Sequence, residues 1–469
     1  MRSSAAIALL VGCALAVAAH AADAAGPTLT VAETAPYLRG DIPILIGLAA
    51  HTNTVRITPR SPGRLQLFAG DQGLRVGAGQ VIAITAGASG LKVERGAETW
   101  EAAGVEFAPD SPSGTFGFWA SNGVAGAYRG SLRVAPDGAG RVTAINALPL
   151  EDYLLGVVGA EMSSGSPREA LRAQAIVART YALASLRGHA AQGFDLCATV
   201  HCQVYRGALR VPPRVAQAVQ TTAGLAVARG EQIVTTFYHS TCGGISADAD
   251  DVRWATGLPY RGARFDGATA DADLSADQAV RTFLASRTAR FCRAAPRYRW
   301  RRNYTLAAAE ALVARNLPIV LEQPGLQVGH LLDLAVSERA PSGRVHALDV
   351  VTDTGAYTVR QGDIRWLFGE GKASTGGLPS TLFVLDAARS ADGRALRFSF
   401  AGAGWGHGIG LCQQGAQARA RRGESAAQII AAYYPTCQVV DARKAVGAQC
   451  LWHGVAHANG MAEPSYWAR

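Results

Sequence analysis

The sequence has few charged residues, few aromatic residues and no long apolar run in its body. Of its 469 residues, 17% are charged and 7% are aromatic, and no window of 18 apolar residues follows the amino-terminal segment. A multi-pass membrane protein and a coiled coil are therefore excluded. The hydrophobic fraction of 49% and the mean hydropathy of +0.09 also exclude a disordered chain.

Lysine is nearly absent, so arginine carries almost all of the positive charge. The 45 basic and 36 acidic residues leave a formal net charge of +9. Such a charge favours anionic partners, such as a nucleic acid or an acidic polymer, and composition alone does not choose between them. The 53 glycines indicate many turns, and the length suggests roughly two to four domains.

The amino terminus has the pattern of a cleaved secretory signal. Arg2 precedes an apolar stretch, residues 5–19, that is too short to span a bilayer, and Ala19-His20-Ala21 supplies small residues for a signal peptidase. We predict a signal peptide at residues 1–21 and export to the periplasm or the cell-wall space, without a transmembrane anchor. The run Leu10-Val11-Gly12-Cys13 resembles a lipobox, so lipoprotein anchoring at Cys13 is the minor alternative.

Seven cysteines follow the predicted signal peptide. In an oxidising compartment some of them should pair, and the odd number leaves at least one free or bound to a metal. They are Cys197, Cys202, Cys242, Cys292, Cys412, Cys437 and Cys450.

The remaining pattern predicts an α+β fold with a β-rich amino-terminal domain at residues 27–145, where short alternating runs are separated by turn residues. Residues 146–440 mix helical and strand patterns, with an inserted subdomain at about 270–390, and residues 441–469 form a tail. The clearest helix has Ser166 as its N-cap and Pro167 at its first position, and it ends near Leu186. Shorter expected elements are a strand at 233–238 and helices at about 306–316, 413–422 and 426–434.

Two charged residues of the mixed region could carry chemistry. Glu161 follows an apolar run, and desolvation raises the pKa of a carboxyl group and suits it to general acid catalysis. The alternative is a helix-end glutamate paired with an arginine. Arg179 lies midway along the apolar helix, where it either extends to solvent or clamps an anionic group of a ligand.

Glycine occupies every second position of residues 402–410. Such alternation strips one face of a strand or loop of side chains and lets a ligand or another backbone approach. Trp405 and His407 lie on the opposite face. The alternative is a packed glycine segment with a structural histidine. No strand–helix unit with a later acidic residue follows, which argues against a dinucleotide site.

A local cluster of metal-ligand residue types consists of His189, Cys197, His201 and Cys202. Two thiols and two imidazoles suit a tetrahedral Zn²⁺ site, which would be structural because all four positions are filled. The alternative is a Cys197–Cys202 disulfide with two incidental histidines. Spacing alone does not decide between them.

Several motifs then follow one another in a recognisable order. They are Leu150-Glu151-Asp152-Tyr153-Leu154, Glu161-Met162, Ala178-Arg179-Thr180-Tyr181, Gln203-Val204-Tyr205-x-Gly207, Ser240-Thr241-Cys242-Gly243-Gly244, Gly406-His407-Gly408-Ile409-Gly410 with Gln413, and Tyr433-Tyr434-Pro435. In order and spacing they resemble the stage II sporulation protein D (SpoIID/LytB) family over about residues 125–437. The β-rich front matches only loosely, and Ser163 stands where the family often has proline.

The resemblance implies a peptidoglycan lytic transglycosylase. In such an enzyme Glu161 would protonate the glycosidic oxygen between N-acetylmuramic acid and N-acetylglucosamine, and then take a proton from the muramic acid C6 hydroxyl to close a 1,6-anhydro ring. One carboxylate suffices, because the internal hydroxyl replaces the water or nucleophile that a second carboxylate manages in other glycosidases. The residues that would bind the substrate are Arg179, Tyr205, Ser240, His407 and Gln413.

The resemblance also favours zinc at His189, Cys197, His201 and Cys202, because some family members bind zinc before the Gln-Val-Tyr motif. This Zn²⁺ would be structural, and the chemistry itself requires no cofactor. Cys242 and Cys412 lie in turns that the family brings toward the substrate, so a disulfide between them is a further hypothesis.

Other functions compete with this one. A non-catalytic wall-binding protein that enhances an amidase also occurs in the family, which makes an amidase a candidate partner beside peptidoglycan glycan strands. A metallohydrolase would instead use the histidine and cysteine cluster for chemistry. Nucleic-acid binding would use the arginine runs at 297–302 and 419–422, but these have the pattern of solvated faces, and export separates the protein from most nucleic acid.

Overall fold

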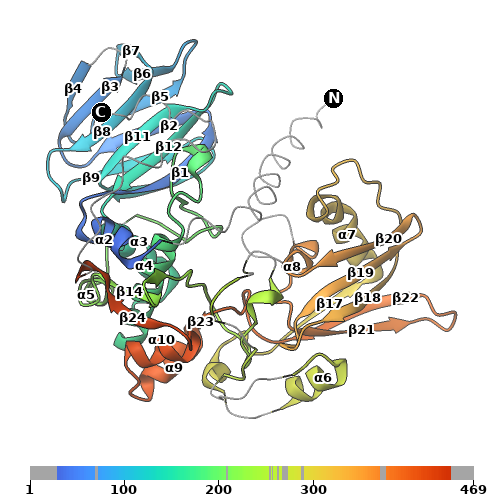
Figure 1. Cartoon of the computed structure of the whole chain (residues 1–469). Coiled ribbons are helices and arrows are strands. Elements are labelled where there is room, and N and C mark those ends of the chain that lie inside the picture. The colour runs from blue at the N-terminus through green and yellow to red at the C-terminus, as the bar shows by residue number, and fades with distance from the viewer. Residues whose placement is uncertain are drawn as a thin grey trace. The chain divides into compact units, whose positions relative to one another are not determined.

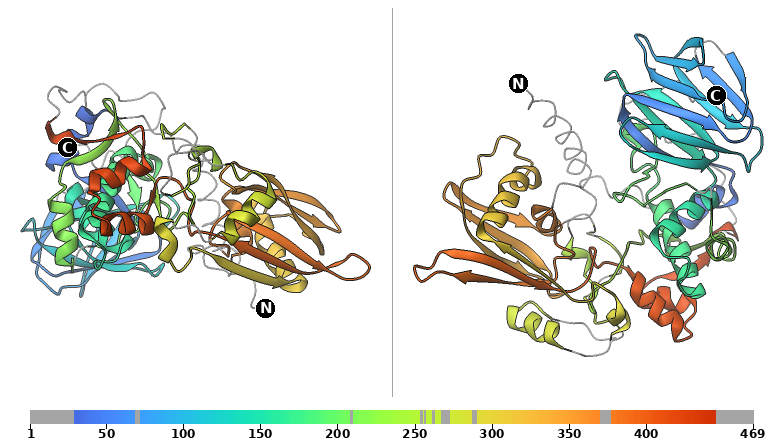
Figure 2. Two further views of the ribbon diagram at one scale, coloured as in Figure 1. Left: turned by 90° about the horizontal axis from the view of Figure 1, so that it is seen from below. Right: turned by 180° about the vertical axis from the view of Figure 1, so that it is seen from behind.

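The computed structural model describes residues 29–68, 72–207, 210–252, 255, 257–260, 263–266, 273–286, 290–369 and 377–444. The predicted signal peptide, Cys13, Cys450 and most of the predicted tail lie outside the described residues. The chain forms two compact units, shown in Figures 1 and 2. The sandwich unit runs from Gly26 to Val234 and resumes at Val439, and the mixed unit runs from Thr235 to Gln438.

Two β-sheets pack face to face in the sandwich unit, which confirms the β-rich amino-terminal region (Figure 1). Their strand orders are β13-β1-β12-β11-β8-β3-β4 and β10-β9-β2-β5-β6-β7. The rings of Phe107 and Phe116, one from each sheet, meet edge to face with 5.8 Å between their centroids. The strands are β1 (Ile44–Thr52), β2 (Thr54–Pro59), β3 (Gly63–Phe68), β4 (Gln72–Val76), β5 (Ile82–Ala86), β6 (Leu91–Arg95), β7 (Glu98–Ala102), β8 (Gly104–Pro109), β9 (Thr115–Ala120), β10 (Ala125–Arg129), β11 (Ser131–Pro136), β12 (Val142–Leu148) and β13 (Leu196–Cys197).

A helical layer follows the sheets in the same unit. Helix α4 is buried along most of its length, which accounts for its many alanines. It begins one residue after the predicted start, because Pro167 has extended backbone and is itself the N-cap, so the predicted Ser166 cap is wrong. The elements are α2 (Val31–Arg39), α3 (Leu150–Glu161), α4 (Arg168–Ala184), η1 (Ala190–Gln192), α5 (Pro213–Gln220) and η5 (Ala442–Lys444), with the small sheet β15-β14-β24 made of β14 (Leu225–Arg229), β15 (Gln232–Ile233) and β24 (Gln438–Asp441).

The mixed unit contains two three-stranded antiparallel sheets, β17-β22-β21 and β18-β19-β20. Helix α7 contributes Val313 and Leu317 to a core that also holds Phe398. The predicted helices at about 306–316, 413–422 and 426–434 are confirmed as α7, α9 and α10. The elements are η2 (Ala249–Asp251), α6 (Asp277–Ala285), η4 (Phe291–Ala294), β17 (Trp300–Thr305), α7 (Leu306–Val320), β18 (Leu331–Arg339), β19 (Val345–Thr352), β20 (Gly355–Arg360), α8 (Asp363–Leu367), β21 (Phe383–Arg389), β22 (Ala395–Gly402), α9 (Gln413–Arg421) and α10 (Ala426–Tyr433).

A short parallel pair joins two distant segments of the mixed unit. Strand β16 (Tyr238–His239) pairs with β23 (Leu411–Cys412), so that His239 lies opposite Cys412. The expected strand at 233–238 is therefore wrong over most of its length, because only its two ends join β15 and β16. The alternating glycines form a loop after Gly402 rather than a strand, since residues 404, 406, 408 and 410 all have φ between 67° and 109°.

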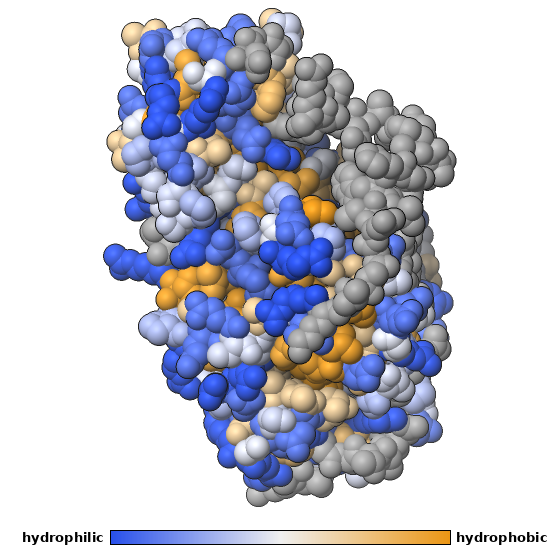
Figure 3. Space-filling view, turned by 60° about the vertical axis from the view of Figure 1, so that its left-hand side comes forward, coloured by the Kyte–Doolittle hydropathy of each residue, from blue (hydrophilic) through white to orange (hydrophobic). Residues whose placement is uncertain are grey.

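The molecule as a whole combines helices with several sheets, as the predicted α+β class requires. On the face seen in Figure 3, hydrophilic residues cover most of the surface and apolar areas are smaller. Among the described helices, none has both the length and the apolar character needed to cross a bilayer.

Candidate functional site

Glu161 is the last residue of α3 and is half-buried. The helix ends there because Met162 takes up an extended conformation, with φ of −137°. The backbone N–H of Val204 donates to Oε1 of Glu161 at 2.8 Å. This bond fixes the orientation of the carboxyl group at a helix end, a position from which a carboxyl group can exchange a proton with a bound ligand.

The segment that holds Glu161 is itself anchored by buried polar contacts. The hydroxyl of Tyr205 donates to Oδ1 of Asn146 at 3.0 Å, and the hydroxyl of Tyr153 donates to Oε1 of Gln203 at 3.2 Å. Burial raises the pKa of Tyr205 well above its usual value, so its hydroxyl remains protonated. The 3% exposed Tyr205 is thus a packing residue that positions Val204, and its predicted contact with substrate stays a prediction.

Arg179 is completely buried and pairs with Glu151, a residue the sequence analysis did not single out. Its Nε and Nη2 donate to the two carboxylate oxygens of Glu151, both at 2.7 Å. The remaining N–H groups donate to carbonyls of Ala175, Val219 and Leu225 at 3.1–3.4 Å. All five donors therefore point into the unit. In this conformation Arg179 ties α3 and α4 to the small sheet and presents no surface for the ligand contact that the resemblance implied.

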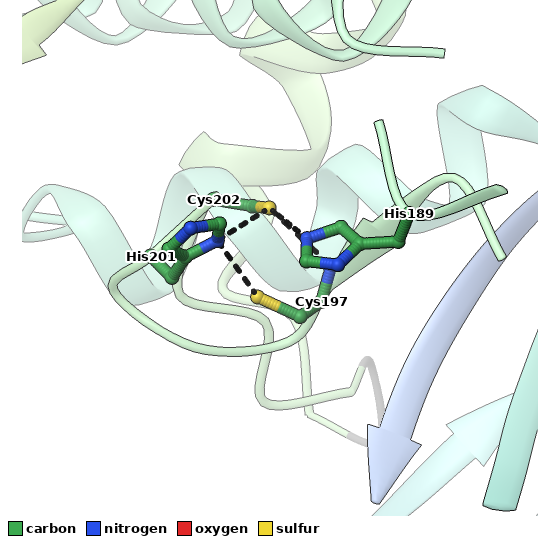
Figure 4. A group of neighbouring side chains, drawn as sticks. All are labelled: His189, Cys197, His201 and Cys202. Atoms are coloured by element: carbon green, nitrogen blue, oxygen red, sulfur yellow. Dashed lines mark hydrogen bonds between the residues drawn. The ribbon is translucent and has the colours of Figure 1, made fainter. Parts of the chain in front are cut away.

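The histidine and cysteine cluster predicted from the sequence is assembled in the structure (Figure 4). The ligand atoms of all four residues lie within 4.8 Å of one another. Nε2 of His189 is 3.3 Å from Sγ of Cys202, and Nδ1 of His201 is 3.5 Å from Sγ of Cys202 and 3.7 Å from Sγ of Cys197. These distances are close to the N···S edge of about 3.6 Å in a tetrahedral zinc site.

The surroundings of this cluster also suit a metal. His189 donates from Nδ1 to Oε1 of Gln192 at 2.6 Å, which leaves Nε2 as the ligating nitrogen. Hydrogen bonding from Cys202, and then from His189 and His201, holds the pKa of the Cys197 thiol well below its usual value. Both cysteines are free thiols, so the alternative Cys197–Cys202 disulfide is not the state of this structure.

The sheet holds this loop in place through a glycine. Strand β13, which carries Cys197, pairs in parallel with β1, with Gly47 opposite Cys197. A Cβ atom at Gly47 would lie 2.6 Å from the ring of Phe194. That ring in turn stacks on His189 with 4.8 Å between centroids. The cluster is therefore fixed to the sheet by close packing that only glycine allows.

The other predicted substrate-binding residues belong to the mixed unit. His407 lies in the glycine loop, donates from Nε2 to the carbonyl of Tyr238 at 2.9 Å, and accepts from the N–H of Ile409 at 3.0 Å. Burial lowers the pKa of His407 to about 3, so its imidazole is neutral. It therefore supports the loop, which matches the structural alternative, while its contact with substrate stays a prediction.

Ser240 and Gln413 directly follow the two strands of the parallel pair, at its carboxyl end. Ser240 follows β16 and its carbonyl accepts from the N–H of Gln414 at 3.1 Å, whereas Gln413 begins α9 and is 9% exposed. Beside them Trp405 is 38% exposed, with the guanidinium of Arg297 stacked 4.3 Å from its ring centroid. An exposed indole of this kind offers an apolar face to a ligand. Trp405 and the arginine run that contains Arg297 were both noted in the sequence, but the contact between Arg297 and Trp405 was not predicted.

Cys242 and Cys412 are free thiols in the structure, so the proposed disulfide between them is absent. The Sγ of Cys412 accepts hydrogen bonds from the backbone N–H groups of Cys242 and Gly415, both at 3.3 Å. The sulfur of Cys242 instead lies 3.5 Å from that of Cys292, a residue whose partner was not predicted from the sequence.

Comparison with known families places the Glu161 segment within a known domain. Residues 138–228 match the model of the Stage II sporulation protein (SpoIID) family, and residues 247–410 match a domain of unknown function (DUF8618). The molecule is therefore an α+β protein with a SpoIID domain that carries Glu161, Arg179 and the histidine and cysteine cluster. This match and the chain's relatives support a protein of the SpoIID family, with the SpoIID domain itself at residues 138–228.

Three relatives show how far the similarity extends. An uncharacterised protein of Brachyspira hyodysenteriae is 38% identical over 137 residues, 29% of this chain and 36% of the relative. The amidase enhancer of Bacillus subtilis is 26% identical over 304 residues, 60% of this chain and 39% of the relative. Stage II sporulation protein D of Bacillus subtilis is 22% identical over 320 residues, 64% of this chain and 76% of the relative. The chain thus spans less than two thirds of the length of the first two.

Proposed function

We propose that this SpoIID-family protein acts on the bacterial cell wall after export, as a lytic transglycosylase of peptidoglycan glycan strands. The observation that carries the proposal is the carboxyl group of Glu161, which stands at the end of α3 with one oxygen held by the Val204 N–H at 2.8 Å. Family membership supports the assignment, since Glu161 lies within the matched SpoIID segment.

In the proposed reaction Glu161 serves first as acid and then as base. Its carboxyl group protonates the glycosidic oxygen, and the bond from that oxygen to C1 of N-acetylmuramic acid breaks. The C6 hydroxyl oxygen of the same sugar bonds to C1, and its proton returns to Glu161. No water is consumed and the carboxyl group is regenerated, so a single acidic residue is enough. The N–H of Val204 keeps that carboxyl group in one orientation through both steps.

The histidine and cysteine cluster is proposed to hold a structural Zn²⁺. The four residues supply two thiolates and two neutral imidazoles, with nitrogen–sulfur distances of 3.3–3.7 Å. Such an ion cross-links its own ligand loop and contributes folding free energy rather than catalysis. The segment after this loop carries Gln203 and Val204, so zinc would act on Glu161 only through the position of that segment.

The test compares wild type with Glu161→Gln on purified glycan strands, using mass spectrometry to count 1,6-anhydromuramic acid ends. We expect the variant to lose at least about 100-fold of the wild-type rate, since general acid–base catalysis is typically worth about 10²–10⁴-fold. Glu169→Gln is the matched control, because Glu169 is paired with Arg172 on α4 and should retain full activity. Equal release by wild type and Glu161→Gln contradicts the assignment.

A second candidate function is that of a non-catalytic enhancer of an amidase. The observation in its favour is the similarity to the Bacillus subtilis amidase enhancer, which covers 60% of this chain. It predicts that neither wild type nor Glu161→Gln releases anhydro ends, while both raise the rate at which an added cell-wall amidase degrades the same wall preparation. Measuring both rates in one experiment separates the two functions.

A further inference from the structure

We propose that the mixed unit contains a second zinc site, formed by His239, Cys242, Cys292 and Cys412. This site is separate from the histidine and cysteine cluster of the sandwich unit. It does not depend on the proposed reaction. Its four residues are each 5% exposed or less.

The fold gathers these four residues from three separate segments. Strand pair β16–β23 sets His239 directly opposite Cys412, and Cys242 follows three residues after His239. Cys292 comes from η4, in the same buried cluster of cysteines. Cys242 and Cys412 are 170 residues apart in the chain. Convergence of three thiols and an imidazole at one buried point is typical of a metal centre and costly without one.

The distances fit a tetrahedral ion. The sulfurs of Cys242 and Cys292 are 3.5 Å apart, near the S···S edge of about 3.8 Å that Zn–S bonds of about 2.3 Å require. The ligand atoms of His239, Cys242 and Cys412 all lie within 4.8 Å of one another. The sulfur of Cys242 therefore lies near the ligand atoms of all three other residues.

His239 has the tautomer and the free nitrogen that a zinc ligand needs. A carbonyl only accepts, so the contact of 3.0 Å between Nδ1 and the carbonyl of Ile409 means that Nδ1 carries the proton. Nε2 is left as a lone-pair donor, and among the described residues it is buried without a hydrogen-bond partner. Zinc-bound histidines are held in this manner by a second acceptor behind the ring. Ligation by Nε2 accounts for an otherwise unsatisfied buried atom.

Backbone N–H groups surround the sulfurs as they do in thiolate sites. The N–H of Gly244 donates to Cys242 at 3.4 Å, and those of Cys242 and Gly415 donate to Cys412. The turn that allows the first bond needs glycine at Gly243 and Gly244, whose φ values are 75° and 102°. Cys412 is also the N-cap of α9, where the helix dipole favours a negative charge.

Nearby groups fit this charge distribution. Asp266 is 6% exposed, and its Oδ2 and Oδ1 accept from the N–H of Cys292 at 3.1 Å and from the hydroxyl of Tyr433 at 3.3 Å. An oxygen of Asp266 lies within 4.8 Å of the sulfurs of Cys242 and Cys292, but both of its oxygens already accept hydrogen bonds, so we assign it as a neighbour that holds the backbone of Cys292 rather than as a ligand. Arg299 donates to the carbonyl of Gly243 at 2.7 Å and offsets the negative charge of three thiolates.

A disulfide explains less of this arrangement. It would join two of the three cysteines, leave the third thiol buried, and leave Nε2 of His239 without a partner. One zinc ion uses all four atoms.

The test uses the full chain with Cys197→Ser and Cys202→Ser, which removes the sandwich-unit cluster, and measures zinc per chain by mass spectrometry of the metal. We expect this parent to retain one zinc. Adding His239→Ala should weaken its binding by at least about 100-fold, more than the roughly 10–100-fold that is typical when a residue behind a metal ligand is changed. Cys437→Ser, a cysteine of the same unit outside the cluster, is the matched control and should leave the zinc content unchanged. Absence of zinc from the parent double variant overturns the proposal.

Two further measurements do not depend on the folding of the His239→Ala variant. X-ray absorption at the zinc edge of the Cys197→Ser, Cys202→Ser parent should show three sulfur ligands and scattering from one imidazole. If the imidazole scattering is missing, His239 is not a ligand. On wild type, alkylation followed by non-reducing peptide mapping should find Cys242, Cys292 and Cys412 as thiols that react only after the metal is stripped. A disulfide between any two of them overturns the site.

Discussion

The two units gather similar side chains in opposite ways. In the sandwich unit His189 and Cys202 are 13 residues apart, and one loop supplies the whole cluster. In the mixed unit Cys242 and Cys412 are 170 residues apart and meet only because β16 and β23 pair. The first cluster is half-open, since Cys197 and Cys202 are of intermediate exposure, whereas the cysteines of the second are buried.

This difference has a physical consequence. A loop of a dozen residues can hold its ligands together before the rest of the unit folds, because closing a short loop costs little entropy. Ligands 170 residues apart come together only when the sheet and α9 are in place. We therefore expect zinc to organise a local loop in the sandwich unit and to report on global folding in the mixed unit.

The largest effect is expected for the buried ion pair between Arg179 and Glu151 in the sandwich unit. Arg179→Met removes both short hydrogen bonds to the Glu151 carboxylate, which keeps only the N–H of Gly224 at 3.4 Å, and removes one donor from each of three backbone carbonyls. We expect the free energy of unfolding to fall by about 3 kcal/mol, the lower end for breaking a buried pair, because Glu151 is 29% exposed. Urea unfolding followed by circular dichroism measures it.

A pair of similar geometry in the mixed unit is the control. Arg281 also donates through two nitrogens to one carboxylate, that of Asp386, at 2.7 Å and 3.2 Å, but their side chains are 36% and 59% exposed. Arg281→Met should therefore cost at most about 1 kcal/mol. Equal losses for the two variants would show that burial is not what distinguishes them.

The same contrast explains how much could be read from the sequence. Apolar spacing predicted α4 and placed Arg179 on it, and local spacing predicted the cluster at residues 189–202. Glu151 was missed because the partner of Arg179 lies on another helix, 28 residues earlier. Cys292 and His239 were missed as ligands because only the register of β16 with β23 and the position of η4 bring them together. Tertiary contacts of this kind leave no periodic signal in a sequence.

The next effect is the rate at which the two proposed zinc ions are lost. With a mild chelator in excess, the half-exposed cluster should release its ion by local opening, whereas the buried one requires opening of the mixed unit. We expect the two rates of zinc release under native conditions to differ at least about 100-fold, and a colorimetric zinc indicator measures them. In concentrated guanidinium chloride both ions should be released together, and a single native phase would contradict the difference in burial.

A smaller effect concerns the positioning of Glu161. A Cβ atom at Gly156 of α3 would lie 2.5 Å from the ring of Tyr205, so Gly156→Ala should cost about 1–3 kcal/mol through overpacking. It should also lower glycan cleavage by displacing the segment of Val204. At Gly159, three residues on, the nearest atom is 3.8 Å away, and Gly159→Ala should stabilise the helix by about 0.5–1 kcal/mol. Thermal melts and the glycan assay, run on both variants, decide.

The smallest expected effect separates the units by their response to pH. In the mixed unit Nε2 of His346 donates to Oδ1 of buried Asp251 at 3.1 Å, and this hydrogen bond raises the pKa of His346. Because its pKa is raised in the folded state, protonated His346 stabilises the fold fully below the unfolded pKa of about 6.5. This stabilisation is lost as the pH rises through the folded-state pKa. His346 is partly exposed, so we expect wild type to lose less than about 1 kcal/mol of unfolding free energy on going from about pH 6 to about pH 8.

In the sandwich unit a comparable pair has the opposite sign. Burial alone would raise the pKa of Asp137, but the hydrogen bond from His51 at 2.7 Å and those from the backbone N–H groups of Ala139 and Arg141 together outweigh it and leave that pKa lowered. The stability that Asp137 contributes is present above its unfolded pKa of about 3.9 and disappears only in acid. His346→Gln should therefore remove the loss of unfolding free energy between about pH 6 and about pH 8 and leave the loss in acid unchanged. Asp137→Asn should remove the loss in acid and leave the other unchanged. Denaturation curves at matched pH values measure the unfolding free energy in both ranges. If both variants changed the same range of pH, the two pairs would not act independently.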